Sequence, residues 1–466
     1  MITAEIKNDL RNIVGWEHVL DSDVDRFGYS YDASFLPLLP ASKPDAIVRP
    51  STTEEVSQVM AIAYEHAIPV TPRGAASGRT GGSIPLNGGI SLSLDRMTQI
   101  RELDEKNMMV TAEAGVRTID LYNRCAEKGL FYPPDPASWK FSTIGGNVAE
   151  NAGGMRAVKY GVTRNNVLGV EAVLASGEVI HCGGKLIKSS TGYDLTQLLV
   201  GSEGTLALIT KAYLRLHPRA PHAATVLAPF ATLGEVTAAV PRIVASGLGP
   251  LMLEYVDLMT MAAMINGLGL KLGIPDEIRA KALAYLVVVL ENTREDRLEE
   301  DAQAAGELLA ELGAMDVYLL PANAGRELIE AREKAFWIAK SSHADDVIDI
   351  VVPRAAIAPF MQRVREIAQS HASLIAGCGH AGDGNVHMAV FQKDPAVRDR
   401  ILRGLFEAGM ALGGAISGEH GLGKEKKKYF QALEDPVKIE LMRRIKAAFD
   451  PAGILNPGTI FDESEV

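Results

Sequence analysis

Apolar and polar positions between residues 51 and 72, "STTEEVSQVMAIAYEHAIPVTP", repeat with the spacing of a helix that buries one face. Thr52 and Glu55 have the spacing of a capping box, which marks a helix start. The stripe expected to face the core consists of Val56, Val59, Met60 and Ala63. The pattern predicts a capped helix followed by a short strand, after an N-terminal helical stretch.

From there to about residue 218 the pattern is that of a β-rich region crowded with glycine. Short alternating strands are expected within residues 89–94 and 166–180. Three glycine-rich stretches accompany them: "RGAASGRTGGSIPLNGG", "STIGGNVAENAGG" and "GSEGTLALIT".

Beyond residue 218 long helical patterns alternate with strands: "EEDAQAAGELLAELGA" and "AGRELIEAREKAFWIAK" accompany "AYLVVVLE" and "MDVYLL". This alternation over residues 220–376 indicates a separate α+β domain. The tail, "DPVKIELMRRIKAAFDPAGILNPGTIF", predicts one amphipathic helix that stops at Asp450-Pro451.

The composition is that of an ordinary globular protein, with 47% hydrophobic and 23% charged residues. A chain of 466 residues exceeds what one hydrophobic core usually supports, so two or three domains are expected. The net charge of −11 argues against nucleic acid as a partner, because an acidic surface repels a phosphate backbone. The basic run "KEKKK" at residues 424–428 is expected to be a solvated helix face.

Three cysteines, Cys125, Cys182 and Cys378, are too few and too dispersed for a disulfide framework, a Cys-rich zinc module or an iron–sulfur cluster. The start "MITAEIKNDL" lacks the apolar core of a signal peptide, and the apolar run "LAYLVVVL" is too short to span a bilayer. We therefore expect a cytoplasmic protein.

The stretch "PRGAASGRTGG" at residues 72–82 suits close approach of backbone N–H groups to a pyrophosphate, although a flexible surface turn explains it equally well. It is not a Rossmann fingerprint, and the literal G-x-G-x-x-G at Gly377, Gly379 and Gly382 precedes no helix. Three such loops in one β-rich domain indicate a large ligand with several polar parts, such as a dinucleotide.

The stretch "CGHAGDGNVHMAV" places His380 and His387 seven positions apart around a turn. Such a pair alone is more often structural than metal-binding, and strict strand alternation would separate the two rings. The "GDGN" turn can break that alternation. Glu419, with His420 beside it in "SGEHGLGKEK", offers a third ligand, and two histidines with one carboxylate suit Zn²⁺, Mn²⁺ or Fe²⁺.

These loops, together with the H-x-G-D-G-N-x-H and G-E-H-G-x-G motifs and the "LNPG" near the end, resemble one family. It is the FAD-linked family of the vanillyl-alcohol-oxidase or p-cresol-methylhydroxylase (PCMH) type, in the branch of D-lactate dehydrogenases and the glycolate oxidase D-subunit. The resemblance implies an α+β fold. A PCMH-type FAD-binding domain of two α+β subdomains with an N-terminal helix is expected over residues 1–218. An α+β substrate (cap) domain with an antiparallel sheet and the metal site is expected over 219–418, and a C-terminal helical segment returning to the FAD domain over 419–466.

The resemblance implies that FAD lies against the glycine loops. It is expected to be non-covalent, because the first loop lacks the histidine to which many members of the superfamily attach FAD. The implied FAD-binding residues are Arg73, Gly74, Ala75, Ala76, Ser77, Gly78, Gly81, Gly82, Pro134, Asp135, Ser138, Thr143, Gly145, Gly146, Asn147, Ala149, Gly153, Gly161, Glu203, Gly204, Ile209 and Asn456.

The same resemblance assigns His380, His387 and Glu419 to one divalent metal, with Zn²⁺ favoured over Mn²⁺ or Fe²⁺. His420 becomes the base, since histidine has an intrinsic pKa suited to proton abstraction near neutral pH. Arg332 would be read from the sequence alone as a solvated helix arginine. The family places an arginine there against the substrate carboxylate, which it can grip bidentately.

The implied reaction is oxidation of a small D-2-hydroxy acid to the 2-oxo acid, with a hydride passing to FAD and D-lactate favoured as the substrate. Relatives that oxidise D-2-hydroxyglutarate carry an asparagine where this chain has Ala389, and a lysine where it has Ile348 before Asp349. A second carboxylate buried without partners is costly, so a monocarboxylate is preferred. The family usually ends "NPGK", whereas this chain has Thr459 in place of the lysine.

The electrons require an external acceptor: an electron-transfer flavoprotein, a cytochrome, a quinone or an iron–sulfur subunit. A homodimer and peripheral attachment to the inner membrane stay open. The alternatives are the FAD subunit of a multi-subunit glycolate oxidase, a D-2-hydroxyglutarate dehydrogenase-like enzyme, a metal-dependent hydrolase without flavin, and a redox-inert flavin-binding protein.

Overall fold

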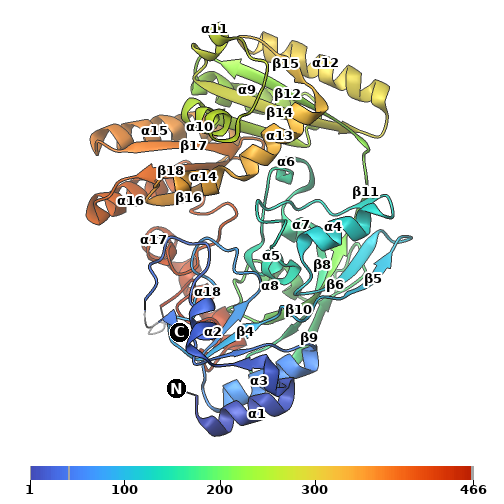
Figure 1. Ribbon diagram of the computed structural model, residues 1–466, viewed down its shortest axis with the longest axis vertical. Helices are drawn as coiled ribbons and strands as arrows, with labels where there is room; N and C mark the ends of the chain where they lie inside the picture. The colour runs from blue at the N-terminus through green and yellow to red at the C-terminus, as the bar shows by residue number, and fades with distance from the viewer. Residues whose placement is uncertain (1, 40–41, 463–466) are drawn as a thin grey trace. The chain divides into compact units, whose positions relative to one another are not determined.

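The structure is a computed structural model that describes residues 2–39 and 42–462 (Figure 1). The described residues divide into two compact units. The first unit contains residues up to 152, residues 162–218, and the C-terminal segment from residue 419. The second unit contains residues 153–161 and 219–418.

The first unit mixes helices and strands. Its helices are α1 (Ala4–Val14), α2 (Asp23–Gly28), α3 (Thr53–Glu65), α4 (Thr118–Ala126), α5 (Ile144–Glu150), α7 (Thr163–Asn166), α8 (Leu195–Leu199), α17 (Lys427–Leu433) and α18 (Pro436–Phe449). Its strands are β1 (Val19–Leu20), β2 (Ala46–Val48), β3 (Val70–Arg73), β4 (Ile90–Ser93), β5 (Ile100–Asp104), β6 (Met109–Glu113), β7 (Leu130–Phe131), β8 (Val167–Val173), β9 (Val179–Gly183), β10 (Leu208–Arg215) and β11 (His217–Pro218).

Two main sheets organise these strands. The first has the order β1-β2-β4-β3, in which β4 pairs in parallel with both β2 and β3. The second has the order β5-β6-β10-β8-β9 and is antiparallel throughout. The strand β3 ends at Arg73, so the first glycine loop starts where a buried strand leaves its sheet.

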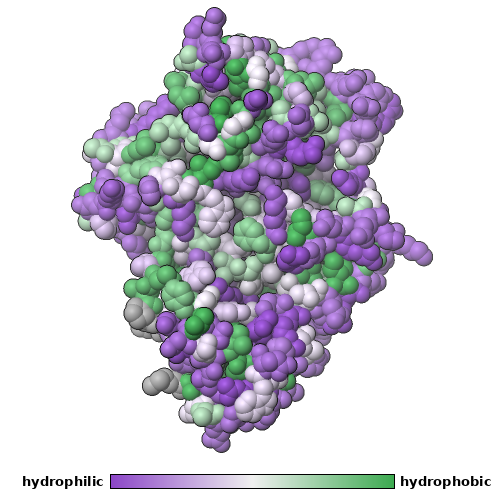
Figure 2. Space-filling model, viewed as in Figure 1, coloured by the Kyte–Doolittle hydropathy of each residue, from purple (hydrophilic) through white to green (hydrophobic). Residues whose placement is uncertain are grey.

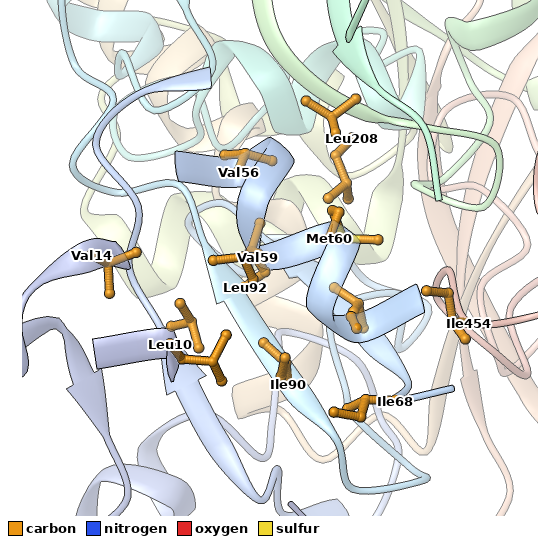
Figure 3. Packing of buried hydrophobic residues seen from close by; sticks show 14 of the residues in the cluster. Leu10, Val14, Val56, Val59, Met60, Ile68, Ile90, Leu92, Leu208 and Ile454 are labelled. Carbon is orange, nitrogen blue, oxygen red and sulfur yellow. The ribbon is translucent and has the colours of Figure 1, made fainter. Parts of the chain in front are cut away.

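The core around the first sheet explains why the C-terminal segment belongs to this unit (Figure 3). Side chains from α1, α3, β4 and β10 pack together with Ile454 and Leu455, which come from beyond α18. Burying each such aliphatic side chain stabilises the fold by about 1.5–3 kcal/mol. The members labelled in Figure 3 are Leu10, Val14, Val56, Val59, Met60, Ile68, Ile90, Leu92, Leu208 and Ile454.

The second unit is built on one antiparallel sheet with the order β15-β12-β14-β13-β17-β18-β16 (Figure 1). Its strands are β12 (His222–Phe230), β13 (Met252–Asp257), β14 (Ala284–Asn292), β15 (Tyr318–Leu320), β16 (Asp346–Val351), β17 (Leu374–His380) and β18 (Asn385–Phe391). Its helices are α6 (Ala157–Tyr160), α9 (Leu233–Ala245), α10 (Leu258–Leu268), α11 (Asp276–Arg279), α12 (Glu295–Glu311), α13 (Ala322–Glu333), α14 (Ala335–Ser341), α15 (Ile357–Ser370) and α16 (Pro395–Ala411).

The predicted helix after residue 51 is confirmed as α3, and the strand that follows it as β3. The predicted capping box of α3 is only half formed. The hydroxyl of Thr52 accepts the Glu55 N–H, but the Glu55 carboxylate accepts the N–H of Ser51 rather than that of Thr52. The helical pattern over residues 324–340 becomes two helices, α13 and α14, which are separated at Lys334.

The run "KEKKK" is not the solvated helix face that its charge predicts. Lys424 and Lys426 are buried, and α17 begins only at Lys427. The Lys424 ammonium donates to Asn456 Oδ1 at 3.1 Å and to Thr459 Oγ1 at 2.7 Å. The prediction fails because these partners, and the acidic groups near Lys424, come from distant parts of the chain.

Hydrophilic residues cover much of the face shown in Figure 2, with hydrophobic residues scattered among them. Among the described residues, no helix combines the length and the apolar character needed to cross a bilayer.

A buried ion pair within the first unit fixes the chain beyond α18. Lys446 donates to Asp450 and to the carbonyl oxygens of Thr205 and Leu455, and Asp450 accepts the N–H groups of Ile454 and Leu455. Both side chains are buried, at 7% and 0% exposure. The pair therefore holds the backbone that leads to Asn456.

Asp450→Asn is expected to lower the free energy of unfolding by about 3 kcal/mol, because it leaves the buried Lys446 ammonium without its counter-charge. Urea denaturation followed by circular dichroism measures the change. Glu440→Gln removes an exposed ion pair on the same helix and should cost less than about 0.5 kcal/mol. Equal losses in the two variants would contradict the account.

Candidate functional site

A cavity of about 70 Å³ in the first unit collects much of the predicted FAD site. Its walls come from the first glycine loop, from α5, from the turn before β10, and from the C-terminal segment. The predicted residues among them are Arg73, Gly74, Gly82, Thr143, Gly145, Gly146, Ala149, Glu203, Gly204, Ile209 and Asn456. The structure thus brings together three loops that are far apart in the sequence.

Several glycines of these loops stand where a side chain would not fit. A Cβ atom on Gly74 would lie 2.3 Å from Thr143 Oγ1, and one on Gly145 would lie 2.6 Å from Ala114 Cβ. Gly204 has a φ of +68°, and its Cβ would lie 2.4 Å from the Pro72 ring. At these three positions the loops approach neighbouring side chains so closely that only glycine fits.

The remaining predicted residues do not line this cavity. In the first loop these residues are Ala75, Ala76, Ser77, Gly78 and Gly81, and in the second loop they are Pro134, Asp135, Ser138 and Asn147. Gly153 and Gly161 group with the second unit. The cavity also has walls that the sequence did not single out: Pro72, Ser83, Leu94, Ala114, Glu150, Ala207 and Leu208.

Buried charges tie the first unit's loops to the C-terminal segment. The carboxylate of Glu203 accepts the N–H groups of Leu422 at 2.8 Å and Gly423 at 2.7 Å. Burial raises the pKa of Glu203, and burial next to the charge of Glu203 raises the pKa of Glu150 well above its usual range. Burial also lowers the pKa of Lys424 to about 8, although the nearby acidic groups oppose that shift.

Asn456 joins the same loops at the predicted position. Its amide donates to the carbonyl oxygens of Gly82 at 3.0 Å and Glu203 at 2.8 Å. The family usually carries a lysine at the position of Thr459. In this chain the buried ammonium of Lys424 donates to the Thr459 hydroxyl, so a positive charge lies near this position although the lysine itself is absent.

His420 lies in the first unit, next to Arg79 of the first glycine loop. The carbonyl of His420 accepts the Thr80 hydroxyl at 3.1 Å, and Nε2 lies 2.9 Å from Arg79 Nη1. A guanidinium can only donate, so Nε2 accepts and the imidazole is neutral, with its proton on Nδ1. A neutral imidazole is the form that can take a proton.

In the second unit, the hairpin of β17 and β18 brings the two predicted histidines together. His380 ends β17 opposite Asn385, and His387 lies two residues further along β18, so all three share one face of the sheet. The ring centroids of the histidines are 4.8 Å apart with an interplanar angle of 82°. Gly384 makes the turn with a φ of +91°.

Two further residues of the second unit meet at His380. Glu254 on β13 lies directly opposite His380, and its two carboxylate oxygens are 2.8 and 2.9 Å from His380 Nδ1. Arg332 on α13 pairs with the same carboxylate at 2.9 Å. All three side chains are buried, so the predicted solvated arginine of α13 is a buried one.

Glu419 follows Gly418, whose N–H donates to Asp349 Oδ2 at 3.0 Å. One ligand atom each from His380, His387 and Glu419 lie within 4.8 Å of one another. Two ligands of one zinc ion stand at most about 4.4 Å apart, twice the zinc–ligand distance. The three side chains, which we call the His-His-Glu cluster, therefore fit a divalent metal after only small shifts.

The chain matches two family models that together account for most of its length. Residues 44–183 match the FAD binding domain, and residues 219–460 match the C-terminal domain of FAD linked oxidases. The chain belongs to the FAD-linked oxidases. It is accordingly an FAD-linked oxidoreductase, and FAD is its cofactor.

Curated relatives match along nearly all of the chain. An uncharacterized FAD-linked oxidoreductase of Mycobacterium tuberculosis is 52% identical, and the aligned region covers 99% of this chain and 100% of the relative. The glycolate oxidase subunit GlcD of Bacillus subtilis is 38% identical, with 99% and 97% covered. A D-lactate dehydrogenase of Anaerostipes hadrus is 36% identical, with 90% of each covered.

The α+β, PCMH-type fold that the sequence predicts is confirmed by a solved structure. p-Cresol methylhydroxylase superimposes with a TM-score of 0.80 over 99% of this chain and 97% of its own, at 18% identity.

The polar residues at these sites that the sequence did not single out include Arg79, Glu150 and Glu254. Glu254 offered the clearest signal, because it is the one acid in the apolar stretch "LMLEYV" and charged residues are almost never fully buried without a partner. Its partners lie too far along the chain to be inferred from spacing.

Gly204→Ala is expected to lower the amount of FAD retained after purification, since the new methyl group meets Pro72 at a backbone angle that alanine rarely adopts. The ratio of flavin to protein absorbance measures the loss. Gly28→Ala, where a Cβ meets nothing within 4 Å, is the control and should retain FAD as the unchanged protein does. Full flavin content in Gly204→Ala would contradict the assignment of this turn.

Proposed function

We propose that this protein oxidises a small D-2-hydroxy acid, preferably D-lactate, to the 2-oxo acid and passes the electrons to an external acceptor. The observation that carries the proposal is the His-His-Glu cluster in a chain that also has an FAD-binding domain. A flavin alone would serve many oxidations. Two imidazoles and a carboxylate around one point suit a metal that binds the hydroxyl and carboxylate of a 2-hydroxy acid together.

FAD supplies a hydride acceptor, which no amino-acid side chain can provide. A divalent metal held by His380, His387 and Glu419 would lower the pKa of a bound hydroxyl group. Zn²⁺ is favoured, and Mn²⁺ or Fe²⁺ suits the same ligands.

The remaining steps belong to side chains of this protein. His420, with a neutral imidazole, takes the proton from the substrate hydroxyl. Arg332 binds the substrate carboxylate and sets the orientation of the molecule. Its pairing with Glu254 holds the guanidinium in place beforehand, so less entropy is lost when the substrate binds.

The side chains near the second histidine support a small substrate. Ala389 lies on β18 two residues after His387 and pairs across the sheet with Val347 of β16, so both stand on the face that carries His387, whereas Ile348 pairs with Met388 on the other face. Neither Ala389 nor Val347 can neutralise a second carboxylate, whose burial without a partner is costly. D-lactate or glycolate is therefore preferred over D-2-hydroxyglutarate.

The second candidate is the FAD subunit of a multi-subunit glycolate oxidase, which the similarity to GlcD of Bacillus subtilis favours. Such a subunit would exchange electrons with a partner chain and turn over slowly by itself. In both candidates the acceptor is external: an electron-transfer flavoprotein, a cytochrome, a quinone or an iron–sulfur subunit.

Anaerobic mixing of the purified flavoprotein with D-lactate should bleach the visible flavin band, whereas L-lactate should leave it unchanged. Removal of the metal with a chelator should abolish the bleaching, and added Zn²⁺ or Mn²⁺ should restore it. Bleaching by glycolate alone would favour the glycolate oxidase subunit. A band that persists with D-lactate, glycolate and D-2-hydroxyglutarate would overturn the substrate proposal.

His420→Gln is expected to slow flavin reduction by D-lactate by about 10²- to 10⁴-fold, the usual contribution of a general base, while FAD content stays unchanged. Stopped-flow absorbance measures the rate. His66→Gln replaces an exposed histidine at the end of α3 and should reduce at the normal rate. A normal rate in His420→Gln would remove this residue from the reaction.

A further inference from the structure

We propose that Glu254 is a positioning residue that orients both the metal ligand His380 and the substrate-binding Arg332. The inference rests on the proposed function, because it takes His380 as a ligand and Arg332 as the carboxylate-binding group. Nothing in the motifs points to Glu254, which stands on β13, a strand that carries none of the other site residues.

The sheet register places Glu254 beside His380. The two residues are direct partners in the antiparallel pairing of β13 with β17, which brings their side chains to the same face. Both carboxylate oxygens lie within 2.9 Å of Nδ1. A carboxylate can only accept a hydrogen bond, so Nδ1 carries the ring proton. Nε2 then carries no proton, and its lone pair can bind a metal. Glu254 thus selects the tautomer that binds a metal through Nε2.

The same carboxylate fixes Arg332. Oε2 of Glu254 lies 2.9 Å from Nη2, and the two side chains are 1% and 8% exposed. Because both side chains are buried, removing one charge leaves the other unpaired, which costs several kcal/mol. The ion pair therefore holds the guanidinium beside Glu254 before any substrate arrives.

One side chain consequently couples two functions that the proposed reaction needs. If Glu254 is replaced by glutamine, His380 Nδ1 keeps at most one neutral amide oxygen as its acceptor in place of the carboxylate, and Arg332 loses its counter-charge. A residue that merely stabilised the sheet would change neither metal affinity nor the Michaelis constant of the folded enzyme.

The test compares Glu254→Gln and Glu254→Asp with Glu291→Gln. Glu291 is a matched control: it is a carboxylate of the same sheet, with its side chain 9% exposed, and it pairs with Lys159 at 3.0 Å and with the Tyr160 hydroxyl at 2.6 Å. Like Glu254, it pairs with one cationic side chain and with a second polar side chain. Neither of these partners belongs to the His-His-Glu cluster. Circular dichroism and flavin content establish that each flavoprotein is folded.

The first readout is Zn²⁺ affinity, measured on chelator-treated flavoprotein by competition with a chelating dye, so that no turnover is needed. Glu254→Gln is expected to bind Zn²⁺ about 10- to 100-fold more weakly, as is usual when the hydrogen-bond partner of a histidine ligand is lost. Glu254→Asp keeps the charge on a shorter arm and should fall between Glu254→Gln and the unchanged protein. Glu291→Gln should bind as the unchanged protein does.

The second readout is flavin reduction by D-lactate at saturating Zn²⁺, where the metal site is refilled. The Michaelis constant should then still be raised about tenfold or more in Glu254→Gln, through Arg332, and be normal in Glu291→Gln.

The outcomes separate this inference from the proposed function. If the unchanged protein binds no Zn²⁺, the metal part of the proposed function fails and this inference fails with it. If the unchanged protein binds Zn²⁺ and folded Glu254→Gln binds it equally well, only the role of Glu254 is overturned. Should Glu254→Gln not fold, Glu254→Asp decides: weaker binding supports the inference, and normal binding with a normal Michaelis constant overturns it.

Discussion

A carboxylate removed almost completely from water must be neutralised and hydrogen-bonded where it lies, and Glu254 meets that requirement with His380 and Arg332. The antiparallel register of β13 and β17 sets the first contact, and the burial of α13 against the sheet sets the second. Because both partners contact the same carboxylate, the histidine and the arginine cannot be repositioned independently. The rest of the site in the second unit is arranged around that constraint.

The first unit obeys a related constraint at its own site. Its glycine loops come so close to one another that Gly74, Gly145 and Gly204 have no room for a Cβ atom. The C-terminal segment is held there by buried charges, since Glu203 accepts two of its N–H groups and Lys446 pairs with Asp450. These contacts explain how Asn456, at the far end of the chain, lines the same cavity as the residues after β3.

Local patterns predicted much of this. The apolar stripe after residue 51 forms α3, the glycine loops line one cavity, and the "GDGN" turn lets His380 and His387 meet on one face. What spacing could not predict are contacts between remote segments. Glu254 is 126 residues from His380, and two lysines of "KEKKK", Lys424 and Lys426, are buried by the fold. The sequence shows that a charge is present, but the fold decides which charge it faces.

The proposed reaction requires this flavoprotein to carry a metal on the His-His-Glu cluster. Anomalous X-ray diffraction at the zinc absorption edge, from crystals of the protein soaked in Zn²⁺, tests it directly. One strong peak is expected about 2.0–2.2 Å from a nitrogen of His380, a nitrogen of His387 and a carboxylate oxygen of Glu419. A fully reducible flavin in crystals without any anomalous peak at these three residues would contradict it.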